Sequence, residues 1–358
     1  MNFEFLSDYT SVKFTGLDKI FDVAATAFSF RNPFTDTIVN VRWYGIIIAL
    51  GFTLAALFGG RMAYKWKMDL NKMVDVLIYG TFGGIIGARL FYVAFKWDYY
   101  AEHLSEIFQI WNGGLAIYGG IIGGLIAAYI TCRAEKLNFR NLLDLAGMSL
   151  LIGQGIGRWG NFTNQEAFGT NTDLPWGMTS NKVTSYIVRH LDEFEANGFT
   201  MDPSLPVHPT FLYESLWCLI GFVLLYIICR KYRKFSGQII LCYGIWYGIG
   251  RTIFEGLRTD SLYISGTSIR VSQLISAVMV VVFSALLIYL LAKYKKNPQP
   301  IEGVDFFPEP EVKTDKKADA KNAAGNDVVE TVIFEEKSGE SSGDADEPQA
   351  EQEEKADE

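Results

Sequence analysis

Side chains that build the common soluble active sites are scarce in this sequence. Its 358 residues include three histidines and four cysteines, and the cysteines have neither the spacing of a disulfide framework nor that of a metal-ligand set. No nucleotide-binding loop, no Ser/His/Asp pattern and no repeat of fixed period occurs. We therefore expect reduced cysteines, no metal and no other cofactor, and we find no support for nucleotide-dependent or serine-hydrolase chemistry.

An N-terminal signal is also missing, because MNFEFLSDYTSVKF has no basic region followed by a short apolar core. We expect no cleavable signal peptide. The net charge of −8 arises at the other end, where residues 301–358 contain 19 Asp and Glu against six Lys, and the first 300 residues carry +5. With few large apolar residues, 297–358 cannot bury enough surface to offset chain entropy, so we expect a disordered acidic tail.

Apolar residues, in contrast, are abundant: 49% are hydrophobic and 15% aromatic. A membrane-spanning helix needs about 20 mainly apolar residues. Seven stretches qualify, at roughly 43–60, 73–95, 113–132, 142–158, 209–229, 238–257 and 270–292. Lys and Arg collect after the first, third, fifth and seventh, in RMAYKWK, CRAEKLNFR, CRKYRKF and KYKKN. We predict an all-α polytopic membrane protein with about seven transmembrane helices, its N-terminus outside and its C-terminus cytoplasmic.

This topology divides the chain into three regions. Residues 1–42 form an outer-face segment, in which 17–30 is expected as a helix lying in the membrane interface. Residues 43–292 form the membrane domain, and the acidic tail follows. The longest connection, about 159–208, lies at the outer face and contains a predicted amphipathic helix, SNKVTSYIVRHLDEF.

Charged residues inside predicted spans are candidates for function, because they are costly in lipid. The fourth span ends in GRWGNFTNQEAFG, which brings Arg158 and Glu166 to the outer face. The sixth ends in YGIGRTIFEGLRTD, where four side chains are spaced i, i+4, i+8 and i+11 and so are expected to share one helical face. These four are Tyr247, Arg251, Glu255 and Arg258.

Three arginines and two glutamates are predicted at the same depth in the membrane, and this excess of positive charge favours an anionic ligand. The planar fork of arginine matches phosphate oxygens two at a time, and a phospholipid headgroup supplies phosphate at that depth. Two other interpretations remain open. Arg251 and Glu255 form a self-neutralising i,i+4 pair, or the whole cluster is a structural polar collar that ties the fourth and sixth spans together.

Other features have both a structural and a functional interpretation. Small-xxx-small glycine pairs in the second and third spans indicate close helix packing. Tyr44 and Tyr118 lie where interfacial aromatic anchors are common. The phenol of Tyr118, if it lies beside the arginines, can have a lowered pKa and act as a base. His208 precedes the fifth span and is expected to cap it rather than to catalyse.

The stretch GRWGNFTNQEAFG resembles the signature of the prolipoprotein diacylglyceryl transferases, G-R-x-G-N-F-x-N-x-E. Further matching segments occur in the family's order, and the resemblance covers roughly 40–292. These segments are RWYG at 42–45, GARLFYV at 87–93, NGGLAIYGG at 112–120, HPTFLYE at 208–214 and YGIGRTIFEGLR at 247–258.

The resemblance implies an activity and its partners. Family members transfer a diacylglyceryl group from phosphatidylglycerol to the thiol of the cysteine that will begin a bacterial lipoprotein, forming a thioether and releasing glycerol phosphate. It implies two substrates, phosphatidylglycerol and a prolipoprotein signal peptide with a lipobox cysteine, and no nucleic acid. It also implies a multi-pass protein of the bacterial plasma membrane with its active site toward the outer face.

The resemblance also assigns roles to individual residues. Arg158 matches the phosphatidylglycerol-binding arginine of the signature. Asn161 and Glu166 match its polar positions and Gly169 matches the glycine just after it, and we assign these three to substrate binding as well. Arg251 matches an arginine important for transfer. We place Glu255 and the tyrosine Tyr44 with Arg251 as catalytic residues, and Arg258 and Tyr247 with the binding residues.

One position departs from the family, because several members have histidine where this sequence has Tyr118. That histidine has been proposed as the base for the thiol, and the ordinary pKa values of phenol and imidazole differ, at about 10 and 6.5. Either Tyr118 is the base in a lowered-pKa form, or Glu166, Glu255 or His208 takes this role. Two rival classes, a transporter and a lipid-binding scaffold, are less well supported, since the chain shows no inverted repeat and the signature is specific.

Overall fold

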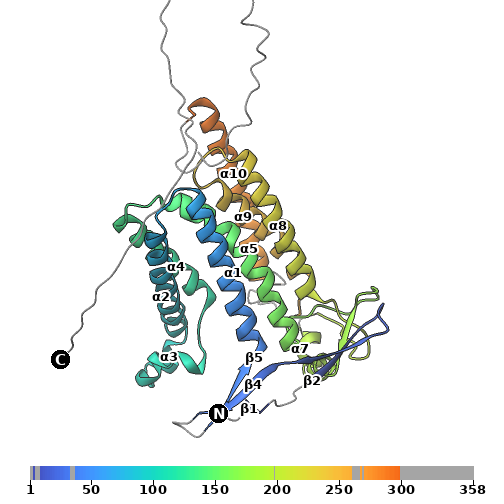
Figure 1. Cartoon of the computed structure of the whole chain (residues 1–358). Helices are drawn as coiled ribbons and strands as arrows, with labels where there is room; N and C mark the ends of the chain where they lie inside the picture. Colours follow the sequence, from blue (N-terminus) through green and yellow to red (C-terminus); the bar gives the residue numbers. More distant parts are fainter. Residues whose placement is uncertain are drawn as a thin grey trace, which may run out of the picture. The chain divides into compact units, whose positions relative to one another are not determined.

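The computed structural model describes residues 3–4, 9–32, 37–196, 198–259, 267 and 270–298, and it is mostly helical (Figure 1). Among these described residues, five helices are long and apolar enough to cross a membrane: α1 (Trp43–Lys65), α2 (Leu70–Phe95), α4 (Ile117–Ala134), α8 (Thr210–Tyr232) and α10 (Val271–Lys296). Two further long helices, α5 (Phe139–Asn164) and α9 (Gln238–Glu255), coincide with the fourth and sixth predicted spans. The predicted acidic tail lies outside the described residues, apart from its first two positions.

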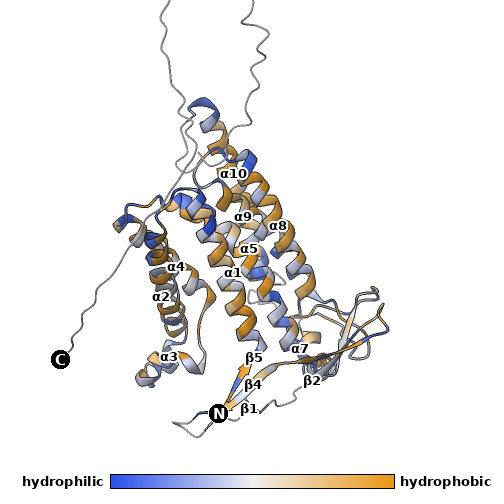
Figure 2. Cartoon of the chain, viewed as in Figure 1, coloured by the Kyte–Doolittle hydropathy of each residue, from blue (hydrophilic) through white to orange (hydrophobic). Residues whose placement is uncertain are grey.

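Helix α5 is the centre of the main bundle. It packs against α1, α8 and α9, and α10 packs against α9 (Figure 1). The bundle core contains Met148 and Leu151 of α5, with Leu225 of α8 and Ile239 of α9. Apolar residues also cover the outer surfaces of these helices (Figure 2), as expected where a helix faces lipid rather than water.

Helices α2 and α4 pack mainly against each other. Gly83 and Gly87 of α2 face Gly119 and Gly123 of α4, and a Cβ added to any of the four would come within 3 Å of the partner's backbone. Of the predicted small-xxx-small pairs, these two make the close approach. The remaining predicted pairs, Gly80/Gly84 and Gly120/Gly124, lie at ordinary van der Waals distance. These glycines therefore bring α2 and α4 together, and they leave no space between the two helices for acyl chains.

The connection from α2 to α4 is organised by Arg89, the arginine of GARLFYV. This connection contains α3 (Trp97–Tyr100) and two 3₁₀ turns, η1 (Leu104–Phe108) and η2 (Ile110–Asn112). The Arg89 guanidinium is buried and lies 5.3 Å from the ring centroid of Tyr100. It donates hydrogen bonds of 2.6–2.9 Å to the carbonyls of Glu106, Ile107, Gly113 and Gly114. This arginine is thus structural: it satisfies backbone groups that the loop leaves unpaired.

A buried ion pair fastens the bundle where α5 begins. Asp144 of α5 contacts Arg233 with 2.9 Å between Oδ2 and Nη2, and it also accepts from the backbone N–H groups of Gly237 and Ile240. The Arg233 guanidinium lies 4.2 Å from the ring centroid of Trp66. These contacts fix the turn between α8 and α9 on α5, and so set the relative positions of three helices that carry site residues at their other ends.

The N-terminal region contradicts the prediction of an all-α protein. It forms strands β1 (Phe3–Glu4), β2 (Tyr9–Phe14), β3 (Ile20–Ala24), β4 (Thr26–Arg31) and β5 (Ile38–Arg42), and β6 (Met178–Ser180) joins from the long connection. The two antiparallel sheets have the orders β1-β4-β5 and β3-β2-β6. The predicted interfacial helix at 17–30 is therefore wrong. Its residues are rich in β-branched and aromatic side chains, which favour pairing of neighbouring strands.

The connection between α5 and α8 forms a small head with the N-terminal strands. Strand β2 pairs with β6, and α6 (Asn181–Arg189) and α7 (Leu191–Ala196) follow. The predicted amphipathic helix is therefore present, but as two helices that meet at His190. Ser180 caps α6 by accepting from the backbone N–H of Val183 at 3.2 Å. The head has its own apolar core, in which Val12, Val183, Ile187 and Val207 are buried.

Candidate active site

The signature stretch lies at the end of α5 and in the turn that follows it. Helix α5 continues through Asn164, and the backbone then adopts the left-handed conformation at Gln165 and Ala167, with φ of 51° and 54°. This sharp exit turns the chain back, so that Glu166 lies beside the last turn of α5. The side-chain amides of Asn161 and Asn164 donate to its Oε1 at 3.0 and 3.3 Å. Two of the predicted residues, Asn161 and Glu166, are therefore in direct contact.

Glu214 joins two of the predicted arginines. It lies on the second turn of α8 and is 6% exposed. Its Oε2 forms an ion pair with Arg158 Nη2 of α5, and its Oε1 faces Arg258 Nη1 at 3.3 Å. One carboxylate thus holds two guanidinium groups from different segments, and the group retains one net positive charge.

Arg258 reaches this position by a different route from the predicted one. Helix α9 ends at Glu255, so Arg258 does not continue the helical face of Arg251. Residues 257 and 258 instead pair with the chain after the signature: Gly169 and Arg258 form a β-bridge, and Thr170 N–H donates to Leu257 O at 3.0 Å. Gly169 is buried there, and an added Cβ would lie 2.9 Å from Leu257 O. The structure gives Gly169 a packing role.

Arg251 and Glu255 form a second, separate ion pair on α9. Arg251 Nη2 lies 2.7 Å from Glu255 Oε2, which confirms the i,i+4 pairing considered from the sequence. Glu255 is 1% exposed and also accepts from the hydroxyl of Ser272 on α10. Tyr247, one turn before Arg251, stacks on Tyr243 with 5.9 Å between ring centroids. Arg251 is thus positioned by a buried carboxylate that α10 holds in place.

The two predicted catalytic tyrosines have different environments. Tyr44, on the first turn of α1, lies against Gly160 in the last turns of α5, where an added Cβ would be 2.8 Å from its Cδ2 atom. This places Tyr44 beside the signature. Tyr118 lies on α4 and is 44% exposed, and it forms no hydrogen bond or ring contact with the other described residues. The structure therefore does not bring Tyr118 into contact with the arginines.

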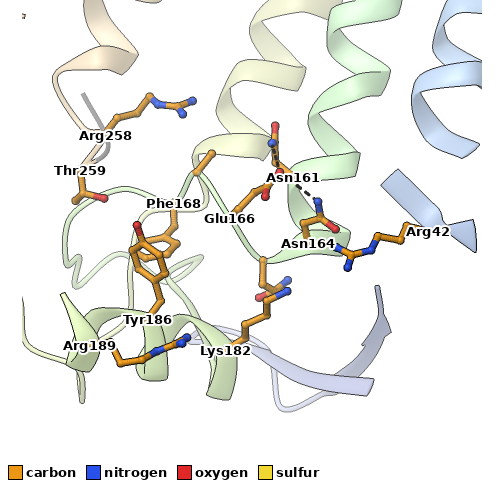
Figure 3. A pocket seen from close by; sticks show the side chains of 12 residues that line it. Arg42, Asn161, Asn164, Glu166, Phe168, Lys182, Tyr186, Arg189, Arg258 and Thr259 are labelled. Atoms are coloured by element: carbon orange, nitrogen blue, oxygen red, sulfur yellow. Dashed lines mark hydrogen bonds between the residues drawn. The ribbon is translucent and has the colours of Figure 1, made fainter. Parts of the chain in front are cut away.

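A cavity of about 450 Å³ opens beside these groups. Its lining includes Asn161, Asn164 and Glu166 of the signature and four cations on different sides (Figure 3). The cations are Arg42 from β5, Lys182 and Arg189 from α6, and Arg258. With Glu166 as the one carboxylate in the lining, the cavity has an excess of three positive charges and suits an anionic group.

His208 lies at the start of α8, near the bridge between Gly169 and Arg258. Its Nδ1 is 3.1 Å from the hydroxyl of Tyr213, and its backbone pairs with Thr170 and Gly169. Partial burial lowers the pKa of His208 below its ordinary value of 6.5. The side chain forms no hydrogen bond that caps α8, so the expected capping role is not observed.

Four of these residues were not predicted for the site. Glu214 was available to sequence analysis as a lone carboxylate within an apolar helix, which is a signal for function. Arg42 lies in the matching segment RWYG but was not assigned a role, and Lys182 and Arg189 gave no signal, because cations outside the spans are ordinary surface residues. Lys182 and Arg189 belong to α6, which follows β6 in the sheet β3-β2-β6, whereas Arg42 belongs to β5 of the other sheet.

Long apolar helices, with arginines gathered at the end of the bundle that carries the head, define a multi-pass membrane protein with a cationic site. The model of the family named prolipoprotein diacylglyceryl transferase matches residues 34–289. The chain belongs to this family and is a transferase, as the sequence predicts.

Individual relatives agree with this assignment over most of their length. Proteins named phosphatidylglycerol–prolipoprotein diacylglyceryl transferase from Listeria welshimeri and Finegoldia magna are 44% and 43% identical over 262 and 259 residues. These alignments cover 73% and 72% of this chain and 88% and 93% of the relatives. The protein of that name from Staphylococcus aureus strain Newman is 42% identical over 272 residues, covering 76% of this chain and 92% of its own.

Proposed function

We propose that this protein transfers the diacylglyceryl group of phosphatidylglycerol to the lipobox cysteine of bacterial prolipoproteins. The observation that carries the proposal is the group Arg158–Glu214–Arg258 beside a cavity with four cations. A phosphodiester is the anionic part of the lipid, and guanidinium groups bind phosphate oxygens in pairs. Family membership supplies the reaction, and the arginines supply a means of performing it.

The reaction is a displacement at carbon. The cysteine sulfur, as thiolate, attacks the glyceryl carbon that carries the phosphate ester. The new C–S bond forms as the C–O bond breaks, and glycerol phosphate leaves with the bonding electron pair. Negative charge grows on the phosphate in the transition state, so preorganised cations there lower the barrier. Arg158, Arg251 and Arg258 are the residues we assign to this stabilisation.

The thiol proton needs an acceptor, and of the candidates from the sequence we favour Glu166. It is exposed and lines the cavity, where the amides of Asn161 and Asn164 orient it. Glu255, in contrast, is buried and already paired with Arg251. Glu166→Gln should lower kcat and flatten its rise with pH, because the base is removed. An unchanged kcat and pH profile would exclude Glu166.

The proposed topology has seven spans, with α5 and α9 crossing the membrane inside the bundle. Their polar residues face neighbouring helices: Gln154 of α5 donates to the hydroxyl of Tyr243 on α9 at 2.8 Å. The distribution of Lys and Arg supports an outer-face site and a bacterial plasma-membrane location. Single cysteines at positions 13 and 232, probed with a membrane-impermeant thiol reagent in intact cells, should react at 13 alone.

The activity is tested with purified protein in detergent, phosphatidylglycerol and a peptide with a lipobox cysteine. We expect a diacylglyceryl adduct on the thiol by mass spectrometry and equimolar release of glycerol phosphate. Arg158→Ala should abolish both, while Arg133→Ala, an exposed arginine at the far end of α4, should not. Binding of phosphatidylglycerol without any adduct would instead identify a lipid-binding scaffold.

A further inference from the structure

We propose that the cavity beside the signature is the subsite for the glycerol phosphate group, and that Lys182 and Arg189 of α6 determine selectivity for it. This inference rests on the proposed function. It assigns a binding role to α6 of the head, which carries none of the residues predicted for the site from the sequence. The same chemistry occurs in two molecules, the headgroup of the lipid substrate and the released product.

The charges around the cavity favour this ligand class. Four cations surround one carboxylate, and neither Arg42 nor Lys182 forms an ion pair with another described residue. Unneutralised cations in a concave site attract a phosphate and repel an ammonium group. A headgroup that consists of phosphate and neutral glycerol is therefore accepted, whereas an ethanolamine headgroup brings its positive charge toward Lys182 and Arg189.

Helix α6 presents its cations from a fixed position. Lys182, Tyr186 and Arg189 are spaced i, i+4 and i+7, so they share the helical face that lines the cavity (Figure 3). The adjacent face of the helix carries Val183 and Ile187, which are buried in the head core. The helix is thus held by its apolar face, and its basic face is directed at the ligand.

Two carbonyl oxygens supply acceptors for the glycerol hydroxyls. Asn164 Oδ1 and Gln165 Oε1 are buried, belong to residues that line the cavity, and have no hydrogen-bond partner in the described structure. Gln165 is 3% exposed, and its amide nitrogen is already used in a bond to Phe162 O. A buried acceptor without a partner costs free energy, which a ligand hydroxyl would recover once the side-chain amide turns toward the cavity. Cations with amide acceptors match a polyol phosphate better than inorganic phosphate alone.

Arg258 connects this subsite to the reacting bond. It lines the cavity and is also held by Glu214, which holds Arg158. A phosphate beside Arg258 therefore has its glycerol side in the cavity and its diacylglyceryl side toward Arg158. After the C–O bond breaks, glycerol phosphate remains in the cavity until it leaves to water, so the product should inhibit by competing with the lipid headgroup.

The test compares Lys182→Gln/Arg189→Gln with Lys13→Gln, an exposed lysine of the head that does not line the cavity. The double variant should raise KM for phosphatidylglycerol about tenfold, with kcat unchanged, since it loses two exposed cation–phosphate contacts. It should also weaken inhibition by glycerol 1-phosphate and reduce the preference for phosphatidylglycerol over phosphatidylethanolamine as donor. Lys13→Gln should match the wild type in all three measurements.

The KM and inhibition measurements distinguish the two molecules that could occupy the subsite, the lipid headgroup and the released product. A change in KM identifies the lipid headgroup, whereas a change confined to glycerol 1-phosphate inhibition identifies the released product, and either supports the subsite. If neither measurement differs from the wild type, the proposal is wrong. Equal inhibition by inorganic phosphate and glycerol 1-phosphate would overturn the role of the amide acceptors.

Calorimetric titration of glycerol 1-phosphate keeps the subsite separate from the transferase activity. The wild type should bind it, and the double variant should bind about tenfold more weakly. If the wild type binds glycerol 1-phosphate but forms no adduct, the proposed function fails and the subsite stands. If the wild type forms the adduct but does not bind glycerol 1-phosphate, the subsite fails alone.

Discussion

The ring of Tyr44 lies against the α-carbon of Gly160, where α1 meets the last turns of α5. A Cβ at position 160 would come within 2.8 Å of Tyr44 Cδ2. Because Gly160 lies between Arg158 and Asn161, this contact couples the position of the tyrosine to that of the signature. Gly160→Ala should displace the ring and lower transfer about 100-fold, the cost of a displacement near 1 Å in an active site.

The matched control for this variant is Gly60→Ala, further along α1. An added Cβ there meets no atom within 4 Å. It should leave transfer unchanged, and thermal unfolding of both variants in detergent checks that they fold. If Gly160→Ala folds and transfers at the wild-type rate, the position of Tyr44 has no importance for the reaction.

Glu214 is the second position at which structure and activity are coupled. Replacing it by glutamine removes the charge that holds Arg158 and Arg258 together and leaves two close guanidinium groups without a shared counter-charge. Removing one partner of a buried pair costs about 3–5 kcal/mol, so we expect Glu214→Gln to lower the melting temperature and nearly abolish transfer. Glu102→Gln, at an exposed glutamate, is the control for both measurements.

An excess of phosphatidylglycerol tests whether the stability lost in Glu214→Gln comes from the missing charge between Arg158 and Arg258. If added phosphatidylglycerol restores the melting temperature, the lipid phosphate has taken the place of the carboxylate between the arginines. Wild-type stability and transfer in this variant would show that Glu214 is dispensable.

These contacts explain how far the sequence could predict the molecule. The long helices were predictable because apolar length and charge are local properties. The ion pair between Arg251 and Glu255 was also local, since the two residues are one turn apart. The bond from Arg158 to Glu214 was not, because it depends on how α5 packs on α8.

The N-terminal strands were missed for a related reason. Strand β2 is completed by β6, whose residues lie more than 160 positions later in the chain. That long-range pairing has no local signal. The segment predicted as an interfacial helix, 17–30, instead contains β3 and β4, which pair with the nearby β2 and β5, and its mixed polar and apolar pattern resembled an interfacial helix. The pairing of β2 with β6 brings Lys182 and Arg189 to the cavity, so the basic wall of the site was missed together with the sheet.

A substitution at Arg251 tests whether the reaction needs the paired N–H donors of a guanidinium group or only its positive charge. Its Nη2 is engaged with Glu255, which leaves its other N–H groups to bind phosphate. Arg251→Lys keeps the charge but cannot bind the carboxylate and two phosphate oxygens in fixed geometry. We expect kcat to fall about 100-fold, as for loss of a transition-state donor. The measurement is single-turnover transfer at saturating lipid. Arg61→Lys, at an exposed site, is the control. Unchanged turnover in Arg251→Lys would contradict bidentate binding of phosphate by Arg251.

The contact between α2 and α4 gives a prediction that separates packing from catalysis. At Gly87 an added Cβ would lie 2.8 Å from Gly123 Cα, and backbone atoms there can yield only if the helices separate. At Gly84, on the same helix, the nearest atom would be Gly120 O at 3.4 Å. Gly87→Ala should therefore destabilise the protein by about 1–3 kcal/mol through overpacking, whereas Gly84→Ala should be neutral.

Transfer by these two variants also tests Tyr118. Since Tyr118 is on α4 and contacts none of the arginines, partial separation of α2 from α4 should lower the melting temperature without changing kcat at a temperature where the protein is folded. If the separation of α2 from α4 in Gly87→Ala also lowers kcat, α4 contributes to the reaction and Tyr118 becomes the leading candidate for the base. Equal melting temperatures for the two variants would contradict the close glycine packing of α2 against α4.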